Sequence, residues 1–270
     1  MSVPGREHTV RLGVLGWPVA HSRSPAIQNA ALAAAGLTGW RYQLLPVPPA
    51  LLGELIEGLP GAGFRGANVT IPHKQAALAL ATAPTARAAA VGAANTLTFE
   101  PDGRVVADNT DAPALLAALP FAITGRTALV LGAGGSARAV VWALLHSGAT
   151  QVRVWNRSAE RTRRLCDELG GSPTEAIEPA DVLVNCTAVG LDGGDSMEGL
   201  PIGAADVTNF ACVVDLVYAT RTTALVCAAR ERGVAAVDGL QLLIGQGALS
   251  FQRFTGLSAS LPAMRSAVGR

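Results

Sequence analysis

Charged and aromatic residues are scarce in this sequence, and their scarcity narrows the range of functions. Only 15% of the 270 residues are charged and 4% are aromatic, and the formal net charge is +1. Because a nucleic-acid-binding surface needs clustered basic side chains, nucleic acid is not an expected partner. Half of the residues are hydrophobic, which is enough for a sizeable core and argues against disorder. The length allows one large domain or two of moderate size.

Membrane spans, signal peptides and cysteine-based sites are missing as well. No apolar run approaches the roughly 18 residues that cross a bilayer, and residues 1–8 contain no apolar stretch of the signal-peptide type. We therefore expect a cytoplasmic protein without a membrane partner. The cysteines are widely spaced and form no C-x-x-C pair, which predicts reduced thiols in or near the core and no metal site: Cys166, Cys186, Cys212 and Cys227.

The stretch from Thr127 to Ala137 carries the clearest motif of the chain. Residues 128–131 form a short apolar run, which is typical of a buried parallel strand. Gly132, Gly134 and Ala137 follow with the spacing G-x-G-x-x-A. In such a turn the first glycine permits a tight bend and the second lets the backbone approach a pyrophosphate. The small third residue lets the following helix pack on the strand.

The segments after this turn complete a βαβ unit. Residues 138–145 have apolar side chains at helical spacing, and residues 152–155 (V-R-V-W) predict the next strand. A helix that begins at the glycine turn presents free N–H groups and the positive end of its dipole to an anion. An ordinary strand-to-helix turn is the alternative, but the complete βαβ unit favours dinucleotide binding.

The end of the second strand in this unit indicates which dinucleotide is bound. NAD-binding proteins place Asp or Glu there to accept a hydrogen bond from the ribose 2′-hydroxyl. This chain instead has Asn156, Arg157 and Ser158, with Arg161 one helical turn later. Guanidinium groups match a phosphate bidentately, and a basic first helical turn is unfavourable for the helix dipole unless an anion is bound. The pattern therefore favours the 2′-phosphate of NADP over a solvated basic helix start.

The N-terminal part contains two candidate substrate-binding serines in a polar loop, which follows a predicted strand at residues 10–15. Ser24 precedes Pro25, as the N-cap residue of a helix precedes a proline at the first helical position. This structural role explains Ser24 and leaves Ser22 less well explained. Contact of both serines with a substrate is the functional alternative.

Lys74 and Asp111 are two charged residues that admit a catalytic interpretation. Lys74 follows a predicted strand at residues 66–71 and opens a helix at residues 75–81, where a cation opposes the dipole. A lysine near a strand end can donate a proton once its pKa is tuned, although a surface lysine is the ordinary alternative. Asp111 begins a helix over residues 112–119, where a carboxylate is favourable without any function.

Two further patterns complete the predicted topology. Residues 94–99 and 104–107 predict short strands on either side of an Asp-Gly turn at residues 102–103, which indicates a hairpin. In the second half, strands and helices alternate, and polar turns follow the predicted strands at residues 182–185 and 213–217. Polar turns at such strand ends line the cofactor site of a dinucleotide-binding sheet. The order of elements predicts an α/β fold.

Over residues 10–256 the chain resembles the shikimate/quinate dehydrogenase family. The matching segments occur in the family's order in both halves, and such a series is not expected by chance. They are P-V-A-H-S-R-S-P (18–25), N-V-T-I-P-H-K (68–74), A-N-T-L (94–97), N-T-D (109–111), G-A-G-G-S-A-R (132–138), N-R-S-x-x-R (156–161), N-C-T-A-V-G (185–190), D-L-V-Y (215–218) and G-L-Q-L-L-I-G-Q (239–246). The resemblance favours functional roles for Lys74 and Asp111 over the structural alternatives.

The resemblance implies two αβ domains around a cleft, the second a Rossmann-type dinucleotide-binding domain. Residues 1–111 and 240–270 would form the substrate-binding and catalytic domain, and residues 112–239 the NADP-binding domain. The glycine-rich helix start and Lys74 would both face the cleft. The implied activity is the reversible reduction of 3-dehydroshikimate to shikimate by NADPH, in the shikimate pathway of aromatic amino-acid biosynthesis.

The matching motifs also carry over site residues. Lys74 and Asp111 would be the catalytic pair. The substrate-binding residues would be Ser22, Ser24, Thr70, Lys74, Asn95, Asp111, Tyr218 and Gln246, with the two serines on the substrate carboxylate. The cofactor-binding residues would be Gly132, Ala133, Gly134, Gly135, Ser136, Ala137, Asn156, Arg157, Ser158, Arg161, Thr187, Val189, Leu216, Gly239 and Leu242. No metal is implied.

Some positions depart from the family pattern and leave alternatives open. His73 stands where the family usually has an aromatic residue, and Phe254 stands where tryptophan is common.

Acceptance of quinate stays open, and a homodimer is one option for the oligomeric state. An NAD-using quinate/shikimate enzyme is a second function, against which Arg157 and Arg161 argue. A non-catalytic NADP-responsive binding protein is a third, against which the retained proton donor Lys74 argues. The serine and Asn-Thr-Asp segments disfavour an enzyme like methylenetetrahydrofolate dehydrogenase.

Overall fold

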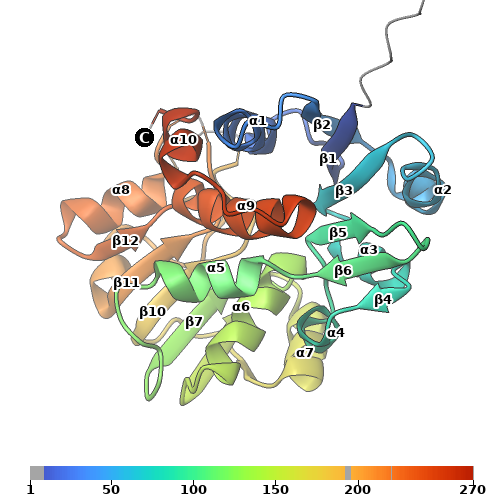
Figure 1. The fold of residues 1–270 in the computed structure, drawn as a ribbon. Coiled ribbons are helices and arrows are strands. Elements are labelled where there is room, and N and C mark those ends of the chain that lie inside the picture. Colours follow the sequence, from blue (N-terminus) through green and yellow to red (C-terminus); the bar gives the residue numbers. More distant parts are fainter. Residues whose placement is uncertain (1–8, 192–195, 220, 270) are drawn as a thin grey trace, which may run out of the picture. The chain divides into compact units, whose positions relative to one another are not determined.

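The computed structural model describes residues 9–191, 196–219 and 221–269. The chain divides into two compact units, whose elements are labelled in Figure 1. The first unit comprises Met1–Thr110 and Gly247–Arg270, and the second comprises Asp111–Gln246. Residues 1–8, on which the expectation of no signal peptide rests, lie outside the described residues.

The first unit is built on a mixed sheet with the strand order β2-β1-β3-β5-β6-β4. β1 pairs in parallel with β2 and β3, whereas β5 pairs antiparallel with β3 and with β6. The predicted hairpin is confirmed by the β5–β6 pair, and Gly103 in its turn has a left-handed φ of 86°. The strands are β1 (Val10–Gly16), β2 (Trp40–Pro46), β3 (Phe64–Val69), β4 (Ala83–Pro84), β5 (Thr96–Phe99) and β6 (Val105–Asp108).

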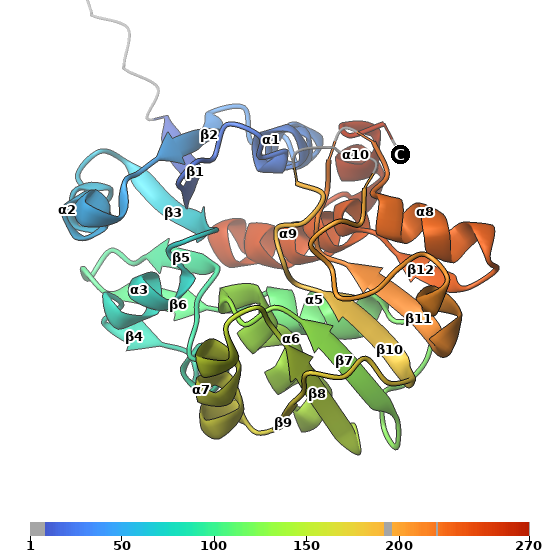
Figure 2. The same ribbon diagram turned by 180° about the vertical axis from the view of Figure 1, so that it is seen from behind.

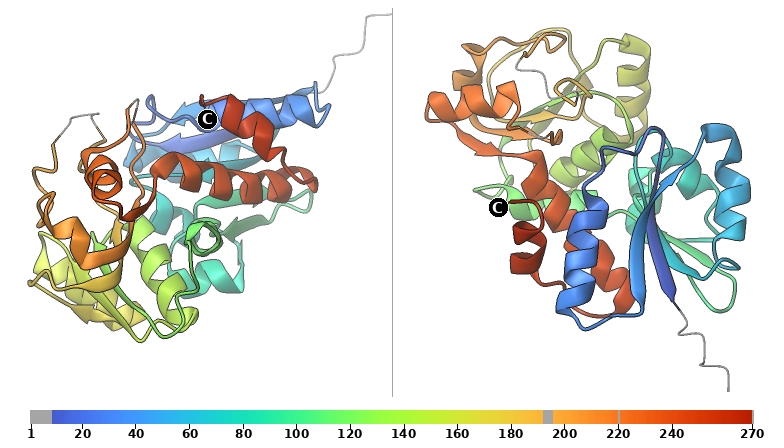
Figure 3. Two further views of the ribbon diagram at one scale, coloured as in Figure 1. Left: turned by 90° about the vertical axis from the view of Figure 1, so that its left-hand side faces the viewer. Right: turned by 90° about the horizontal axis from the view of Figure 1, so that it is seen from above.

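Helices cover both faces of this sheet, as the right-hand view of Figure 3 shows. One face carries α1 (Ser24–Ala34), α10 (Leu261–Ser266) and the C-terminal part of α9 (Gly239–Thr255). The other face carries α2 (Leu52–Gly58), which follows a 3-10 turn at Pro49–Leu51, and α3 (Lys74–Ala79). The short helix α4 (Ala86–Val91) contacts β4 and β6.

Glycine at position 66 of β3 lets α9 approach the sheet, because a Cβ at Gly66 would lie 2.6 Å from Phe254 Cδ1.

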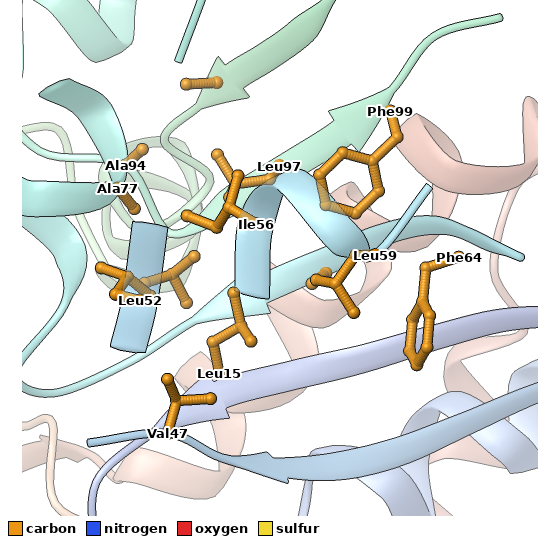
Figure 4. Packing of buried hydrophobic residues seen from close by; sticks show 13 residues of the cluster. Leu15, Val47, Leu52, Ile56, Leu59, Phe64, Ala77, Ala94, Leu97 and Phe99 are labelled. Atoms are coloured by element: carbon orange, nitrogen blue, oxygen red, sulfur yellow. The ribbon is translucent and has the colours of Figure 1, made fainter. Parts of the chain in front are cut away.

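A compact apolar cluster fixes α2 and α3 on their face of the sheet (Figure 4). Leu52 and Ile56 of α2 pack with Leu15 of β1 and Leu97 of β5, and Ala77 of α3 joins the same cluster. Each fully buried leucine or isoleucine side chain contributes about 1.5–3 kcal/mol of transfer free energy. This packing places the start of α3 beside the ends of the strands.

The second unit is built on a parallel sheet with the strand order β12-β11-β10-β7-β8-β9, which Figure 2 shows. The strand that leads into the glycine turn, β7, lies in the middle between β8 and β10. In chain order this arrangement is 3-2-1-4-5-6, the order of the Rossmann fold. The strands are β7 (Thr127–Leu131), β8 (Gln151–Trp155), β9 (Ser172–Pro173), β10 (Ala180–Asn185), β11 (Phe210–Asp215) and β12 (Ala235–Val237). The predicted α/β class and Rossmann-type sheet are confirmed.

The helices of the second unit connect these strands. They are α5 (Asp111–Ala118), α6 (Gly135–His146), α7 (Ala159–Leu169), α8 (Ala224–Glu231) and the N-terminal part of α9, with a 3-10 turn at Asp206–Asn209. An apolar cluster around Leu129, Leu183 and Val213 packs the central strands against Leu225 of α8. An ion pair of 2.7 Å between Arg138 and Glu168 joins α6 to α7.

Sequence-based predictions of local structure differ from the structure at several points. Ser24 is not an N-cap: α1 begins at Ser24, Arg23 occupies the cap position and no side chain caps the helix. The strand predicted to end at Val217 ends at Asp215, because the Asp215 carboxylate accepts a hydrogen bond from Val217 N (3.0 Å) and turns the chain. The short elements β4, β9, α4 and α10 were not predicted, since segments of two to six residues leave little periodicity in a sequence.

The described residues contain no helix with the length and apolar character needed to cross a bilayer. The cysteines are free thiols, as predicted. Cys166 and Cys212 are buried, and Cys186 and Cys227 are partly buried. Burial raises the pKa of the Cys212 thiol to about 11, so this side chain behaves as a small apolar residue.

Candidate active site

The glycine turn after β7 has the geometry that an approaching dinucleotide requires. Gly132 has a φ of 108°, and a Cβ at this position would lie 3.0 Å from the carbonyl carbon of Cys186. Only glycine tolerates both the left-handed backbone and this close approach. Gly134 occupies the N-cap position of α6, and a Cβ there would meet no atom within 4 Å. The turn therefore leaves room beside the free N–H groups of a helix start, which fits a pyrophosphate.

The small residues that follow this turn hold α6 close to the sheet. Ala137 is fully buried in the first turn of α6, which is the packing role predicted for the third small residue of the motif. Ala133, Gly135 and Ser136 are partly exposed at the helix start. Side chains at the turn are thus either absent or small, and the backbone is accessible.

The segment after β8 places its arginines at the surface. Ser158 caps α7, because its Oγ accepts a hydrogen bond from Arg161 N (3.4 Å). Asn156 Nδ2 donates to Ser158 O (3.1 Å), which closes the turn between strand and helix. Arg157 and Arg161 are exposed. Their guanidinium groups are accessible to a phosphate at the end of β8.

The segments after β10 and β11 are joined by a buried polar network. Asn185 Oδ1 accepts hydrogen bonds from Thr187 N (3.0 Å) and Thr187 Oγ1 (2.7 Å), and Thr187 Oγ1 accepts one from Val189 N (3.2 Å). Asn185 Nδ2 donates to Asp215 Oδ1 (2.9 Å). Thr223 Oγ1 donates to Asp215 Oδ2 (2.7 Å). The network shapes the turns that carry Thr187, Val189 and Leu216.

Sequence reasoning assigned no role to Asn185, Asp215 or Thr223. The sequence did contain a signal for Asp215. An aspartate at the end of an apolar run is a common turn residue, whose side chain accepts a hydrogen bond from the backbone two residues later. Burial raises the pKa of Asp215 to about 6, and the Asp238 carboxylate acts in the same direction, while the three hydrogen bonds to Asp215 oppose the shift. A buried carboxyl group thus lies directly beneath the Leu216–Tyr218 turn.

Asp215 is expected to make the protein less stable as the pH rises from about 4 to about 6. The folded state holds the Asp215 proton more tightly than the unfolded state, whose pKa is near 3.8, so the unfolding free energy falls across this window. Each tenfold difference in proton affinity is worth about 1.4 kcal/mol, so the full contribution is on the order of 3 kcal/mol. Asp215→Asn removes this titration, and its amide can donate to the Thr223 hydroxyl, which also accepts. Denaturant unfolding measured at several pH values checks the difference.

Glu175→Gln provides the control for this pH dependence, because Glu175 is an exposed carboxylate in the same unit. The unfolding free energy of Asp215→Asn relative to wild type should change between pH 4 and pH 7, whereas that of Glu175→Gln should not. Parallel curves for Asp215→Asn and wild type would show that Asp215 is ionised throughout this range.

The beginning of α9 closes against the turn after β11. A Cβ at Gly239 would lie 2.3 Å from Val217 O, so only glycine fits at this point. Leu216 N donates to Asn185 O (3.0 Å), and Leu242 is buried one turn into α9. Gln246 Nε2 donates to Leu243 O (2.8 Å), and Tyr218 is partly buried.

In the first unit, the serine loop follows β1. Ser24 N donates to Ser22 Oγ (3.3 Å), and Ser22 N donates to Val19 O (3.0 Å). Ser24 is buried and Ser22 is partly exposed. The two hydroxyl groups are therefore held in one turn, and Ser22 is the more accessible of the two.

Thr70 and Lys74 follow β3, the strand next to β1. Thr70 N donates to Leu15 O (2.8 Å), which extends the pairing of β1 with β3. Lys74 is the first residue of α3 and only 8% exposed, so the alternative of a surface lysine is wrong. His73 is buried, and its Nε2 lies 2.8 Å from Val47 O, which ties the start of α3 to the residue after β2.

Lys74 is also the only lysine in the chain, in which the other 20 of the 21 basic residues are arginine. The motifs of the sequence gave no weight to this single lysine. An ammonium can lose its proton, whereas a guanidinium effectively cannot. The single amine of the chain, at a buried helix start, therefore carries a proton that an arginine at this position could not give up.

Asn95 lies immediately before β5 in a hydrogen-bond network. Its Nδ2 donates to Thr110 Oγ1 (2.9 Å), and its Oδ1 accepts from Thr110 N (2.8 Å) and from Thr96 Oγ1 (3.1 Å). Asn68 Nδ2 donates to Asn95 O (3.1 Å), and Tyr42 Oη donates to Asn68 Oδ1 (2.8 Å). The amide of Asn95 is thus held in one orientation. Asn68, which received no role from the sequence, belongs to this network.

The predicted site residues gather at one edge of the sheet in each unit. In the first unit this edge is formed by the carboxyl ends of β1 and β3 and, because β5 runs antiparallel, by the start of β5. It carries Ser22, Ser24, Thr70, Lys74 and Asn95. In the second unit the residues follow the carboxyl ends of β7, β8, β10 and β11, as ligands do in open parallel sheets. Asp111 opens α5 in the second unit, so the predicted catalytic residues Lys74 and Asp111 belong to different units.

A cavity in the second unit is lined by other residues. Its volume is about 740 Å³, and the predicted site residues are not part of its lining, which comprises Ser196, Met197, Ala204, Arg221, Thr222, Ala224, Cys227, Ala228 and Glu231. Among the described residues, no group of three or more His, Cys, Asp or Glu side chains is arranged to hold a metal ion. Geometry at the strand ends, and not cavity size, therefore defines the candidate site.

Comparison with protein families places matches along most of the chain. Residues 14–97 match the shikimate dehydrogenase substrate binding domain. Residues 116–189 match shikimate/quinate 5-dehydrogenase, and residues 239–268 match the shikimate 5′-dehydrogenase C-terminal domain.

Curated relatives and solved structures agree with these matches. The chain is 46% identical over 263 residues to the shikimate dehydrogenase (NADP(+)) of Methylobacterium radiotolerans, covering 92% of each chain. It is 41% identical over 268 residues to that of Paracoccus denitrificans, covering 94% of each. The Thermus thermophilus shikimate 5-dehydrogenase, in complex with NADP(H) and shikimate, is 38% identical with a TM-score of 0.85, over 96% of this chain and 98% of that one. The Aquifex aeolicus shikimate dehydrogenase is 31% identical with a TM-score of 0.86, over 99% and 100%.

Proposed function

Because this chain belongs to the shikimate dehydrogenase family, we propose that Lys74 and Asp111 catalyse its reaction and that the predicted residues around them bind the substrate. The activity is the reversible reduction of 3-dehydroshikimate to shikimate with NADP as the cofactor, a step of the shikimate pathway. Most of the proposed substrate-binding residues lie in the first unit, and the proposed NADP-binding residues lie in the second.

Lys74 acts on the oxygen of the reacting carbonyl group. NADPH, when bound, supplies a hydride to the carbonyl carbon. Negative charge then develops on the oxygen, and the Lys74 ammonium stabilises this charge and donates its proton to form the hydroxyl group of shikimate. In the oxidative direction the neutral amine of Lys74 accepts that proton. Asp111 holds the ammonium in position and accepts a hydrogen bond from a substrate hydroxyl.

The remaining substrate-binding residues orient the ring. Ser22 and Ser24 donate hydrogen bonds to the carboxylate, and Thr70, Asn95, Tyr218 and Gln246 contact the hydroxyl groups. Asn95 suits this role because its own network fixes which way the amide points. A pre-oriented polar group loses little entropy when it binds, which favours the reactive geometry.

NADP fits the residues of the second unit. The pyrophosphate would be held at the glycine turn by Gly132, Ala133, Gly134, Gly135, Ser136 and Ala137. The adenosine 2′-phosphate would be held by Asn156, Arg157, Ser158 and Arg161. The other cofactor-binding residues would be Thr187, Val189, Leu216, Gly239 and Leu242. The support for this fit is the left-handed Gly132 and the open space beside Gly134 at the start of α6.

One observation carries the catalytic assignment: the only lysine of the chain is buried at the same sheet edge as Thr70 and Asn95. Lysine side chains are seldom buried in proteins, and a cation in a first helical turn opposes the helix dipole. A catalytic requirement for a transferable proton explains why the chain keeps it.

Nicotinamide absorbance tests the proposed function directly. Purified protein with shikimate and NADP should produce NADPH, and NAD should be used much less well. Quinate in place of shikimate tests the wider substrate range. NADP binding without turnover of either substrate would instead support a non-catalytic NADP-responsive protein.

The cellular context follows from the same assignment. We propose a cytoplasmic enzyme that acts without nucleic acid or membrane partners, with a homodimer as the alternative to a monomer. Light scattering of the purified protein distinguishes these two oligomeric states.

A further inference from the structure

Asp108, the last residue of β6, is a buried carboxylate held by two arginines. Its side chain is 3% exposed. Arg87 NH2 donates to both carboxylate oxygens at 2.8 and 2.9 Å, and Arg253 NH2 lies 2.6 Å from Oδ2. Thr85 Oγ1 donates to Oδ1 (2.9 Å). Asp108 received no role in the sequence analysis.

The two arginines come from distant parts of the chain. Arg87 belongs to α4, while Arg253 belongs to α9, in the C-terminal segment of the first unit. Both guanidinium groups are partly exposed, at 32% and 47%. Burial disfavours the charge of Asp108, but Asn109 N and the two guanidinium groups hold the pKa of this carboxyl below its usual range. The carboxylate therefore joins α9 to the end of the hairpin.

Asp108 is also connected to the hydrogen-bond network of Asn95. Its Oδ1 accepts a hydrogen bond from Asn109 N (2.8 Å), and its backbone carbonyl accepts one from Asn95 N (3.1 Å). The next residues of the chain are Asn109 and Thr110, and Thr110 contacts both the Oδ1 and the Nδ2 of Asn95. A shift of Asp108 would therefore move both the backbone of Asn95 and the partner of its amide.

We propose that Asp108 is a positioning residue for the substrate-binding amide of Asn95, and that Arg87 and Arg253 hold Asp108 in place. This inference rests on the proposed role of Asn95 in substrate binding. The four-residue link from Arg253 through Asp108 and Thr110 to Asn95 makes substrate affinity depend on a salt bridge outside the substrate contacts. The cofactor residues of the second unit have no part in this link.

Asp108→Asn and Arg253→Met test the link by steady-state kinetics with shikimate and NADP. Asparagine keeps an oxygen for Asn109 N and Thr85, and both guanidinium groups can reach water, so a folded protein is expected. A misplacement of about 1 Å can cost up to about 10²-fold. We expect both variants to raise KM for shikimate roughly tenfold or more, with a smaller change in kcat and an unchanged KM for NADP.

Two further variants separate positioning from a general loss of stability. Arg253→Lys preserves the ion pair and should restore KM for shikimate toward the wild-type value. Asp102→Asn removes an exposed carboxylate from the same hairpin, where it accepts from Arg104 Nε (2.7 Å), and should leave both KM values unchanged.

The proposal is overturned if Asp108→Asn keeps the wild-type KM for shikimate, or if both KM values rise together in the two test variants. Either result, in a wild-type protein that oxidises shikimate with NADP, leaves the proposed function intact. Absence of wild-type turnover would overturn the proposed function instead, and the two failures are therefore distinguishable.

Discussion

Replacing Lys74 by alanine is expected to lower kcat for shikimate oxidation by roughly 10²-fold or more, the usual scale for a general acid or base. The amine acts mainly on charge and a proton that move in the transition state, so KM should change much less than kcat. Steady-state and single-turnover kinetics of wild type and variant measure the two effects. A variant that retains nearly the wild-type kcat and raises only KM would reduce Lys74 to a binding residue.

Lys74→Arg separates the charge of Lys74 from its proton. Arginine keeps a positive charge but cannot act as a proton donor near neutral pH. We expect Lys74→Arg to retain more substrate affinity than Lys74→Ala, yet to remain far below wild type in kcat. Arg65→Ala is a suitable control, because Arg65 lies on β3 near this site in sequence, and its guanidinium donates to Phe99 O (3.3 Å) and lies 3.8 Å from Glu100. Its kinetic constants should match the wild type.

Pairing of Lys74 with Asp111 adds a second readout. If the two side chains act as a unit, the double variant Lys74→Ala/Asp111→Ala should lower kcat by a factor much smaller than the product of the factors for the two single variants. Strictly multiplicative effects on kcat would mean that the two residues act independently, and the proposed pair would then be wrong.

Replacing Arg157 by aspartate is expected to weaken the binding of NADP and to leave the binding of NAD unimpaired. The two cofactors differ by the 2′-phosphate, and each charge-assisted guanidinium–phosphate bond contributes about 1.5–3 kcal/mol. Arg157 and Arg161 are exposed, so the lower end of this range applies to each. Two such contacts give a preference of roughly 10²-fold, at about 1.4 kcal/mol per tenfold. The new carboxylate repels the phosphate and can accept a hydrogen bond from the ribose 2′-hydroxyl of NAD.

The ratio of kcat/KM for NADP to kcat/KM for NAD measures this preference in wild type and variant. Salt should reduce the wild-type ratio, because exposed charges are screened within about 8 Å at physiological ionic strength. Arg163→Asp provides the matched control. Arg163 is an exposed arginine on α7, close to Arg157 in sequence, and it is not one of the predicted cofactor-binding residues. An unchanged ratio in Arg157→Asp would show that Arg157 points into solvent and that the preference is set elsewhere.

The two predictions depend on different levels of structure. The expected role of Arg157 and Arg161 in cofactor preference follows from neighbouring residues in one turn, where Ser158 caps α7 and places the arginines after β8. The proposed catalytic role of Lys74 depends on burial at the edge of the first sheet, which follows only from the packing of α3 and from the strand order.

Local patterns were sufficient for much of the fold and for the cofactor motif. The G-x-G-x-x-A turn specifies its own structure, because the left-handed Gly132 and the small Ala137 are requirements of one short segment. The Asp102-Gly103 turn likewise specified the β5–β6 hairpin. In both cases the determining contacts lie within a few residues, so the sequence alone carries the information.

Long-range packing decided the features that sequence reasoning missed. The antiparallel position of β5 brings Asn95 to the edge that carries Thr70 and Lys74, and no local pattern specifies that strand neighbour. Asp108 meets Arg253 across 145 residues of chain, and Asn185 meets Asp215 because β10 pairs with β11. Periodicity and turn chemistry determine which elements form, whereas burial and the pairing of charges depend on which surfaces those elements share. The sequence by itself therefore determined the α/β elements and the cofactor turn, and only the tertiary structure decided which polar groups are buried together.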